Sequence, residues 1–145
     1  MTESPITVSP KTKLSDVAAL IRAHRIGCVL VVDERGDLAG IVTETDLFVR
    51  EKLIPFTSRR MPALAGEFMN PNRLESSYRA LAARTAAEVM SRPVVTVDAD
   101  ASIGEAARLM LQHDKKRLAV TSSGKLAGIL TRHDLLRALT LKFAA

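Results

Sequence analysis

An imperfect internal repeat restricts the fold of this chain more than any other feature of its sequence. Residues 7–24 align with residues 96–113 at a shift of 89 positions, and residues 38–47 align with residues 126–135 at a shift of 88. The one-residue gap falls between VVDERG and VTSSG, where glycine and polar residues predict a turn that tolerates a deletion. A match this long, with its single gap in a turn, indicates two copies of one structural unit.

Both copies predict the same order of elements. A short β-prone stretch (ITV or VVTV) precedes an amphipathic helix (LSDVAALIRAH or IGEAARLMLQH), in which apolar residues recur at helical spacing. Two apolar runs joined by a glycine-containing turn then predict a hairpin, and a short helix follows. The order is β-α-β-β-α, an α/β fold of α+β-like type. Because the strand sequences are mostly continuous apolar runs, we expect both sheet faces to be covered.

The repeats divide the chain into residues 1–50, a segment at 51–84, and residues 85–145. The first half of that segment is predicted to be loop-like and its end, NPNRLESSYRALAAR, helical. Ser102 followed by Glu105, and Thr85 followed by Glu88, predict helix starts with capping boxes. In the first copy, Thr12 is the expected cap. The first copy lacks a counterpart of AAEVMSRP, so its opening is shorter than that of the second.

The ordered set of features resembles a tandem pair of CBS domains, the Bateman module. The matching features are Thr-Val before the first helix, an alanine-rich helix ending near His, the strand pair around Gly40 or Gly128, the frame Gly-h-h-Thr-x-x-Asp, and EVMSRPVVTV entering the second copy. This resemblance implies two CBS repeats that pack their sheets together with pseudo-twofold symmetry. It also implies two clefts for adenosine-containing ligands such as AMP, ADP, ATP or S-adenosylmethionine. Such modules commonly form homodimers and regulate a partner protein.

The frame Thr-x-x-Asp, at Thr43 and Asp46 and again at Thr131 and Asp134, fits the start of a helix. Threonine at the N-cap and an acid three residues later satisfy each other's backbone amides. The same groups suit a nucleotide, because the helix start and the threonine hydroxyl favour phosphate and a carboxylate accepts two ribose hydroxyls. Gly40 and Gly128 lie inside strands, where glycine indicates a bulge or a close approach to the backbone.

The expected nucleotide-binding residues combine this chemistry with the resemblance, which assigns the purine edge to the backbone of Thr7-Val8 and Thr96-Val97. In the absence of tryptophan, aliphatic side chains would sandwich the adenine, with Ile41, Val29, Ile129 and Leu118 as candidates. The predicted set is Thr7, Val8, Ile41, Thr43, Asp46, Thr96, Val97, Lys116, Arg117, Ile129, Thr131, Arg132 and Asp134.

The two copies differ in charge where phosphate is expected. The second has Lys115-Lys116-Arg117 before its hairpin and Arg132-His133 inside its frame, whereas the first has Ile26-Gly27-Cys28 and Glu44-Thr45. Cations favour phosphate and Glu44 opposes it. From sequence, we therefore expect the cleft of the second frame to prefer the more phosphorylated ligand, unless these charges simply point to solvent.

Other features exclude or weaken several functions. The net charge of +5 allows anionic partners, including nucleic acid, but no predicted helix gathers lysine and arginine on one face, which argues against a nucleic-acid binder. Cys28 is the single cysteine, which fits a reducing, cytoplasmic location and a buried inert thiol. The sequence shows no membrane span, secretory signal or metal site. It also shows no recognisable catalytic frame, so we do not expect an enzyme. His24 and His113 are expected as helix C-terminal residues. A ligand-free structural or dimerisation module is the alternative.

Overall fold

The computed structural model describes residues 1–49, 76 and 79–143. Its elements, in chain order, are β1 (Thr2–Glu3), β2 (Thr7–Val8), α1 (Leu14–His24), β3 (Cys28–Val32), β4 (Leu38–Thr43), α2 (Glu44–Val49), α5 (Ala86–Val89), β5 (Thr96–Asp98), α6 (Ile103–Gln112), β6 (Arg117–Ser122), β7 (Lys125–Thr131) and α7 (Arg132–Phe143). The order β-α-β-β-α is present in both repeats, which confirms the predicted fold. Of the helix predicted after Asn70, residues 79–82 are helical, and most of the rest lies outside the described residues.

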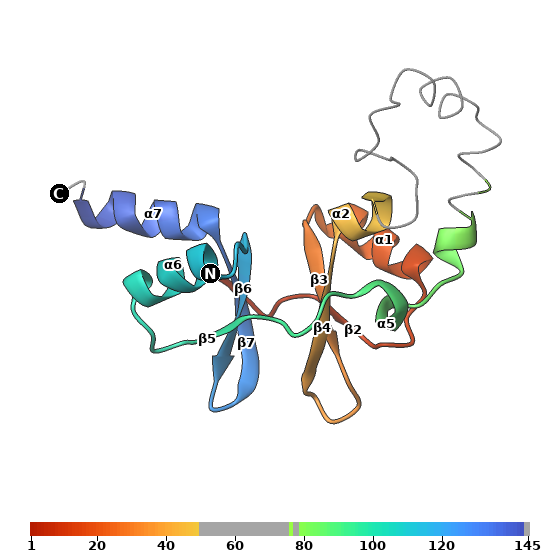
Figure 1. Ribbon diagram of the computed structural model, residues 1–145, viewed down its shortest axis with the longest axis horizontal. Coiled ribbons are helices and arrows are strands. Elements are labelled where there is room, and N and C mark those ends of the chain that lie inside the picture. Colours follow the sequence, from red (N-terminus) through yellow and green to blue (C-terminus); the bar gives the residue numbers. More distant parts are fainter. Residues whose placement is uncertain (50–75, 77–78, 144–145) are drawn as a thin grey trace, which may run out of the picture.

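Two small sheets form the centre of the molecule, and the helices lie on their outer sides (Figure 1). In the first sheet β2 pairs in parallel with β3, and β3 pairs antiparallel with β4; in the second, β5, β6 and β7 repeat this arrangement. The register is equivalent too, since Val31 lies opposite Gly40 and Val120 lies opposite Gly128. A register irregularity follows directly after each pair. The two repeats thus have the same local geometry, as expected from the duplicated sequence.

The short segment that precedes each repeat pairs with the sheet of the other repeat. At the N-terminus, β1 forms a fourth strand against β7, with Thr2 opposite Ile129. Before the second repeat, Ser91 forms a bridge with Ile41 of β4, with two backbone hydrogen bonds of 2.9 and 3.1 Å. Met1-Thr2 is thus the structural counterpart of Met90-Ser91. This exchange corrects the expectation that the first copy lacks a counterpart of all of AAEVMSRP: its last part has one.

Each repeat has its own apolar core beneath its helices. Val29 and Val31 of β3 pack with Val17 of α1, and Val120 of β6 packs with Met110 of α6. The first core also includes Leu81, Ala86, Val89 and Met90 from the chain before the second repeat. Cys28 and Leu30 are buried as well and, by strand alternation, point away from α1 toward the other repeat. Both faces of β3 are therefore covered, as its continuous apolar sequence predicts.

The helix caps agree with the sequence in two cases and differ in one. The Ser102 hydroxyl accepts a hydrogen bond from Glu105 N (3.1 Å), and the Glu88 carboxylate accepts bonds from Thr85 N and Oγ1. The prediction of Thr12 as the cap of α1 is wrong, because Lys13 holds that position and the Thr12 hydroxyl instead accepts from Ser9 N. The backbone of Leu14 donates to Arg84 O (2.8 Å), so a neighbouring segment supplies an acceptor for the start of this helix.

The close approach expected at the strand glycines is present in both repeats. A Cβ atom at Gly128 would lie 2.7 Å from the Thr2 carbonyl oxygen, and one at Gly40 would lie 2.5 Å from the Met90 sulfur. Both distances are far below a van der Waals contact. The two glycines therefore allow the exchanged segments to lie directly against β4 and β7.

Gly128→Ala should destabilise the fold by about 1–3 kcal/mol, the usual cost of overpacking. Gly40→Ala should cost less, because the Met90 side chain can move whereas the Thr2 backbone cannot. Urea unfolding measures both changes. Gly104→Ala in α6 is the matched control, since its Cβ would meet only Ser102 Oγ at 3.8 Å. Equal stability of Gly128→Ala and wild type would contradict the close approach at β7.

Candidate functional site

The two Thr-x-x-Asp frames cap the helices that follow the hairpins. Asp46 Oδ2 accepts hydrogen bonds from Thr43 N (2.9 Å) and Oγ1 (3.2 Å), and Asp46 N donates to Thr43 Oγ1. Asp134 Oδ2 accepts the same pair of bonds from Thr131, each 2.9 Å long. The capping interpretation of the repeated frame is thus confirmed in both copies. Each cap also fixes a carboxylate at the end of a strand.

The two carboxylates have different surroundings. Asp134 Oδ1 lies 3.6 Å from the N-terminal ammonium of Met1, which the exchanged strand β1 brings there. Partial burial raises the pKa of Asp134, but the hydrogen bonds from Thr131 and the charge of the N-terminus outweigh it and hold this pKa below its ordinary value. Asp46 is buried, with 8% of its surface exposed.

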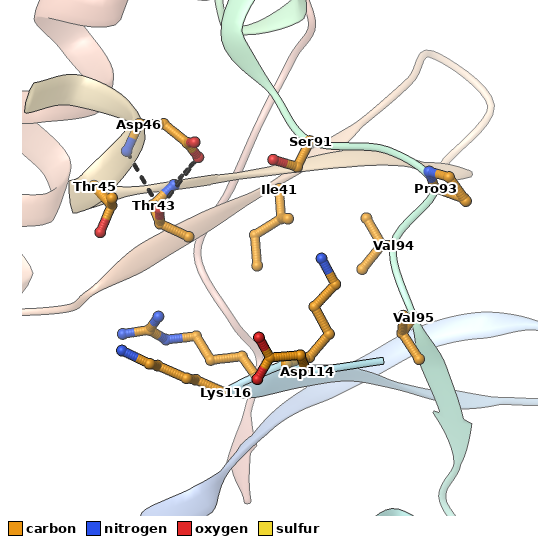
Figure 2. Close-up of a pocket in the computed structure, with 12 residues that line it drawn as sticks. Ile41, Thr43, Thr45, Asp46, Ser91, Pro93, Val94, Val95, Asp114 and Lys116 are labelled. Carbon is orange, nitrogen blue, oxygen red and sulfur yellow. Dashed lines mark hydrogen bonds between the residues drawn. The ribbon is translucent and has the colours of Figure 1, made fainter. Parts of the chain in front are cut away.

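Cleft 1 is a cavity of about 360 Å³ between the repeats, beside the frame of the first. It is lined by Ile41, Thr43, Thr45, Asp46, Ser91, Pro93, Val94, Val95, Asp114, Lys115, Lys116 and Arg117. Figure 2 shows Thr43 and Asp46 on one wall and Lys116 on the opposite wall, with the Ile41 side chain pointing into the space between them. The cleft combines a fixed carboxylate, apolar side chains and three cations within a volume typical of small-molecule sites.

Cleft 2, also about 360 Å³, occupies the equivalent place beside the frame of the second repeat. It is lined by Thr2, Ser4, Pro5, Ile6, His24, Ile26, Gly27, Cys28, Leu30, Arg117, Ile129 and Thr131. In the positions that Lys115-Lys116-Arg117 hold in cleft 1, cleft 2 has Ile26-Gly27-Cys28. Cleft 2 is therefore the more apolar of the two.

The expected charge asymmetry of the clefts is consequently wrong in its direction. Sequence adjacency assigns Lys115 and Lys116 to the frame of their own repeat, but the structure places both in cleft 1, beside Thr43 and Asp46. The reason is the packing across the pseudo-twofold axis: the loop before β6 faces the first frame, and the loop before β3 faces the second. Cleft 1 therefore holds three cations and cleft 2 one, although Asp46 and Asp114 also line cleft 1 and Glu44 begins its helix.

The structure brings together part of the predicted site. Ile41, Thr43, Asp46, Lys116 and Arg117 line cleft 1, and Ile129, Thr131 and again Arg117 line cleft 2. Arg132 and Asp134 are not among the lining residues. The Arg132 guanidinium lies 3.7 Å from the Asp114 carboxylate, and Asp134 is engaged by its cap and the N-terminus.

The structure places Thr7-Val8 and Thr96-Val97, the residues expected at the purine edge, outside the lining of both clefts. The backbones of these residues pair with β3 and β6, and Val8 and Val97 lie in the two cores. The lining residues come from the preceding stretches, residues 4–6 in cleft 2 and 93–95 in cleft 1. Val29 and Leu118 are fully buried in the cores, so of the aliphatic candidates for adenine only Ile41 and Ile129 remain.

Sequence reasoning also missed Ser91 in cleft 1 and His24 in cleft 2. The sequence repeat relates Ser91 to a residue of the other cleft, because the shift of 89 that aligns the repeats also aligns Thr2 with Ser91. His24 ends α1, as expected, but in addition it lines the cleft. The Cys28 thiol lies in the same cleft, where burial raises its pKa, only partly offset by the charge of Arg117, and Glu44 raises it further. This agrees with the expected inert thiol.

Two other classes of site find no support in the described residues. No group of three or more His, Cys, Asp or Glu side chains among them could hold a metal ion. None of their helices has the length and apolar character needed to cross a membrane.

Acidification should release the stabilisation that Asp134 supplies. Since its folded-state pKa is lowered, this stabilisation is present above the unfolded pKa of about 3.9 and is lost as the pH falls through the folded value. Asp134→Asn should lower stability at pH 7 by about 1 kcal/mol and flatten the pH dependence below about pH 4. Urea unfolding from pH 7 to 3 measures this, with Asp16→Asn on the exposed start of α1 as control. An unchanged slope in Asp134→Asn would contradict the assignment.

Comparison with known proteins supports the resemblance. The family described as CBS domain matches residues 1–51 and 86–141, one segment for each repeat. An uncharacterized protein, MJ1404 of Methanocaldococcus jannaschii, is 33% identical over 139 residues, which cover 94% of this chain but only 30% of that protein.

Solved structures show the same architecture. The CBS domain of a CBS domain containing membrane protein from Sphaerobacter thermophilus is 36% identical, with a TM-score of 0.72 over 92% of this chain and 82% of that one. CBSX2, which is from Arabidopsis thaliana, was solved in complex with AMP and is 27% identical, with a TM-score of 0.67 over 98% of this chain and 94% of that one. With one family match on each repeat and this fold, the chain belongs to the CBS domain family as a tandem pair.

Proposed function

We propose that the chain is a regulatory module that binds an adenosine-containing ligand in cleft 1 and signals its presence to a partner protein. The observation that carries this proposal is the composition of cleft 1, which is lined by the capped residue Asp46 and by the cations Lys115, Lys116 and Arg117, with Lys116 on the wall opposite Asp46. CBSX2, a solved structure of the same fold, binds AMP. No catalytic role is part of the proposal.

Each part of such a ligand has a chemical counterpart in cleft 1. The buried Asp46 carboxylate is a fixed acceptor suited to the two hydroxyls of a ribose. Ile41, Val94 and Val95 offer apolar surface to the base. The lysine and arginine side chains bind phosphate by charge-assisted hydrogen bonds. This set favours AMP, ADP or ATP over S-adenosylmethionine, whose sulfonium would face three cations.

Regulation follows from the position of the cleft. A ligand that contacts β4 of one repeat and the start of β6 of the other binds best at one relative arrangement of the repeats. Binding therefore shifts the population toward that arrangement. A partner that recognises the same arrangement is coupled reciprocally to the ligand. A reducing compartment such as the cytoplasm suits the single cysteine.

A homodimer is the second part of the proposal, supported by exposed apolar side chains on α7. Leu136 is 65% exposed, Leu139 39%, Leu141 72% and Phe143 76%. Large exposed apolar residues on one element favour an interface. Light scattering should give twice the mass of the 15.7 kDa chain, and Leu136→Glu with Phe143→Glu should return it to the monomer mass.

Removing the lysines of cleft 1 should weaken the binding of phosphorylated ligands selectively. The double substitution Lys115→Gln and Lys116→Gln should lower AMP affinity about tenfold or more and ATP affinity further, because charge-assisted bonds are lost. Adenosine affinity should hardly change. Calorimetric titration measures all three. Lys125→Gln, an exposed lysine on β7 that lines neither cleft, is the matched control.

Two outcomes would contradict the proposal. One is the absence of binding of AMP, ADP and ATP by the wild-type protein at millimolar concentration, with no thermal stabilisation. At a ligand concentration 100 times Kd the stabilisation should be about 2.7 kcal/mol. The other is an equal loss of affinity for adenosine and ATP in the double variant, which would place the lysines away from the phosphates.

A further inference from the structure

The side chain of Arg117 stands between the two clefts. It is the one described residue that lines both. Its guanidinium lies against the backbone of Gly27 on the cleft 2 side, so close that a Cβ at residue 27 would overlap with it. Its charge also acts on the Cys28 thiol of cleft 2, together with the opposing charge of Glu44. The absence of a side chain at Gly27 is thus what gives this guanidinium a place next to cleft 2.

The two clefts depend on Arg117 to different degrees. Cleft 1 has Lys115 and Lys116 as further cations, and both side chains are exposed and free to follow a ligand. Among the described residues of cleft 2, Arg117 is the one permanent cation. An anionic ligand in cleft 2 therefore needs Arg117, whereas one in cleft 1 has alternatives.

We propose that Arg117 is a cation shared by the two clefts, so that anionic ligands in cleft 1 and cleft 2 compete for it. One guanidinium has a single planar set of donors and cannot form its bidentate bonds to phosphates on both sides. A nucleotide in cleft 1 that draws Arg117 toward it removes the main countercharge from cleft 2. The inference rests on the proposed function and adds to it a negative coupling between the clefts.

This coupling has a chemical signature. A phosphorylated ligand in one cleft should lower the affinity of the other cleft for a second phosphorylated ligand, because both ligands need Arg117. The affinity of cleft 2 for uncharged adenosine should not change when a nucleotide occupies cleft 1. The double-liganded state therefore favours a nucleotide in cleft 1 and a neutral adenosine derivative in cleft 2. The reciprocity of linkage requires the effect to be the same in both directions.

The chain offers one isoleucine reporter for each cleft. Ile41 lines cleft 1 and Ile129 lines cleft 2, so methyl-labelled isoleucine resolves binding at the two clefts in one NMR titration. With AMP, the Ile41 methyl should saturate first and the Ile129 methyl at a concentration at least about fivefold higher, within the usual range of coupling. In Arg117→Met the Ile41 midpoint should rise, whereas the Ile129 midpoint should change little, because in the wild type the ligand in cleft 1 already holds Arg117 when cleft 2 fills.

A second pair of variants separates coupling from a simple difference in affinity. The Lys115→Gln, Lys116→Gln double variant weakens cleft 1 but keeps Arg117. Its Ile129 midpoint for AMP should fall about fivefold or more, since the competitor for Arg117 is weaker. In the Arg117→Met background the same two substitutions should leave the Ile129 midpoint unchanged. Adenosine midpoints at Ile129 should be the same in the wild type and the double variant.

The proposal is overturned if the lysine variant leaves the AMP midpoint at Ile129 where it is in the wild type, or if adding Arg117→Met to the lysine variant does not raise that midpoint. Gly27→Ala gives an independent check, because its Cβ would displace the guanidinium from the cleft 2 side. In the lysine variant, where Arg117 is available to cleft 2, Gly27→Ala should weaken AMP binding at Ile129 and leave adenosine binding there unchanged, because a methyl group that simply blocked the cleft would weaken both. Gly104→Ala, which touches neither cleft, controls for the effect of the added methyl group.

Failure of nucleotide binding is distinguishable from failure of the coupling. If neither methyl responds to AMP, ADP or ATP, the proposed function fails, and inorganic pyrophosphate then tests Arg117 alone. Pyrophosphate should shift the Ile129 methyl resonance in the wild type and not in Arg117→Met. Equal shifts in the two proteins would overturn the placement of Arg117 beside cleft 2.

Discussion

The structure depends on the exchange of two short segments between the repeats. Met1-Thr2-Glu3 lies on β7 and Met90-Ser91 lies on β4, each against a strand glycine that leaves room for it. The chain before the second repeat also fills the first core, where Ala86 and Val89 are almost completely buried. The second sheet therefore takes a strand from the N-terminus, and the first core takes residues from the chain before the second repeat. Both clefts form where an exchanged segment passes between the sheets, so their walls always come from two repeats.

The helix cap and the proposed ligand contact are two uses of the same groups. A carboxylate that caps its helix is held in one orientation by two bonds from the N-cap threonine, as Asp46 is held by Thr43. An acceptor fixed in this way loses little conformational entropy when a ligand binds, which is the general advantage of preorganisation. In the second repeat the N-terminal ammonium neutralises the equivalent Asp134. The same motif thus gives one carboxylate in a cleft lined by three cations and one that lies against the N-terminal ammonium.

The sequence was sufficient for the features that depend on neighbours along the chain. Periodicity predicted the helices, apolar runs predicted the strands, and Thr43 and Thr131 were recognised as caps because capping acts over three residues. The strand β1 was not predicted, because two residues, Thr2 and Glu3, carry no pattern and their partner strand lies at the other end of the chain. The membership of the clefts was predicted only in part. Lys116 was assigned to the wrong frame because adjacency in sequence says nothing about which copy faces it.

The charge asymmetry of the clefts follows from the packing at their junction. The shift of 89 places Gly27 in register with Lys116, and Cys28 in register with Arg117. The Arg117 guanidinium occupies the space that a side chain at position 27 would need. A first repeat with the basic sequence of the second would place two large cations in that space, where they would collide and repel each other. Small residues at positions 27 and 28 are therefore a condition for the basic loop before β6. Because each repeat supplies the wall of the opposite cleft, that condition makes cleft 1 cationic and leaves cleft 2 largely apolar.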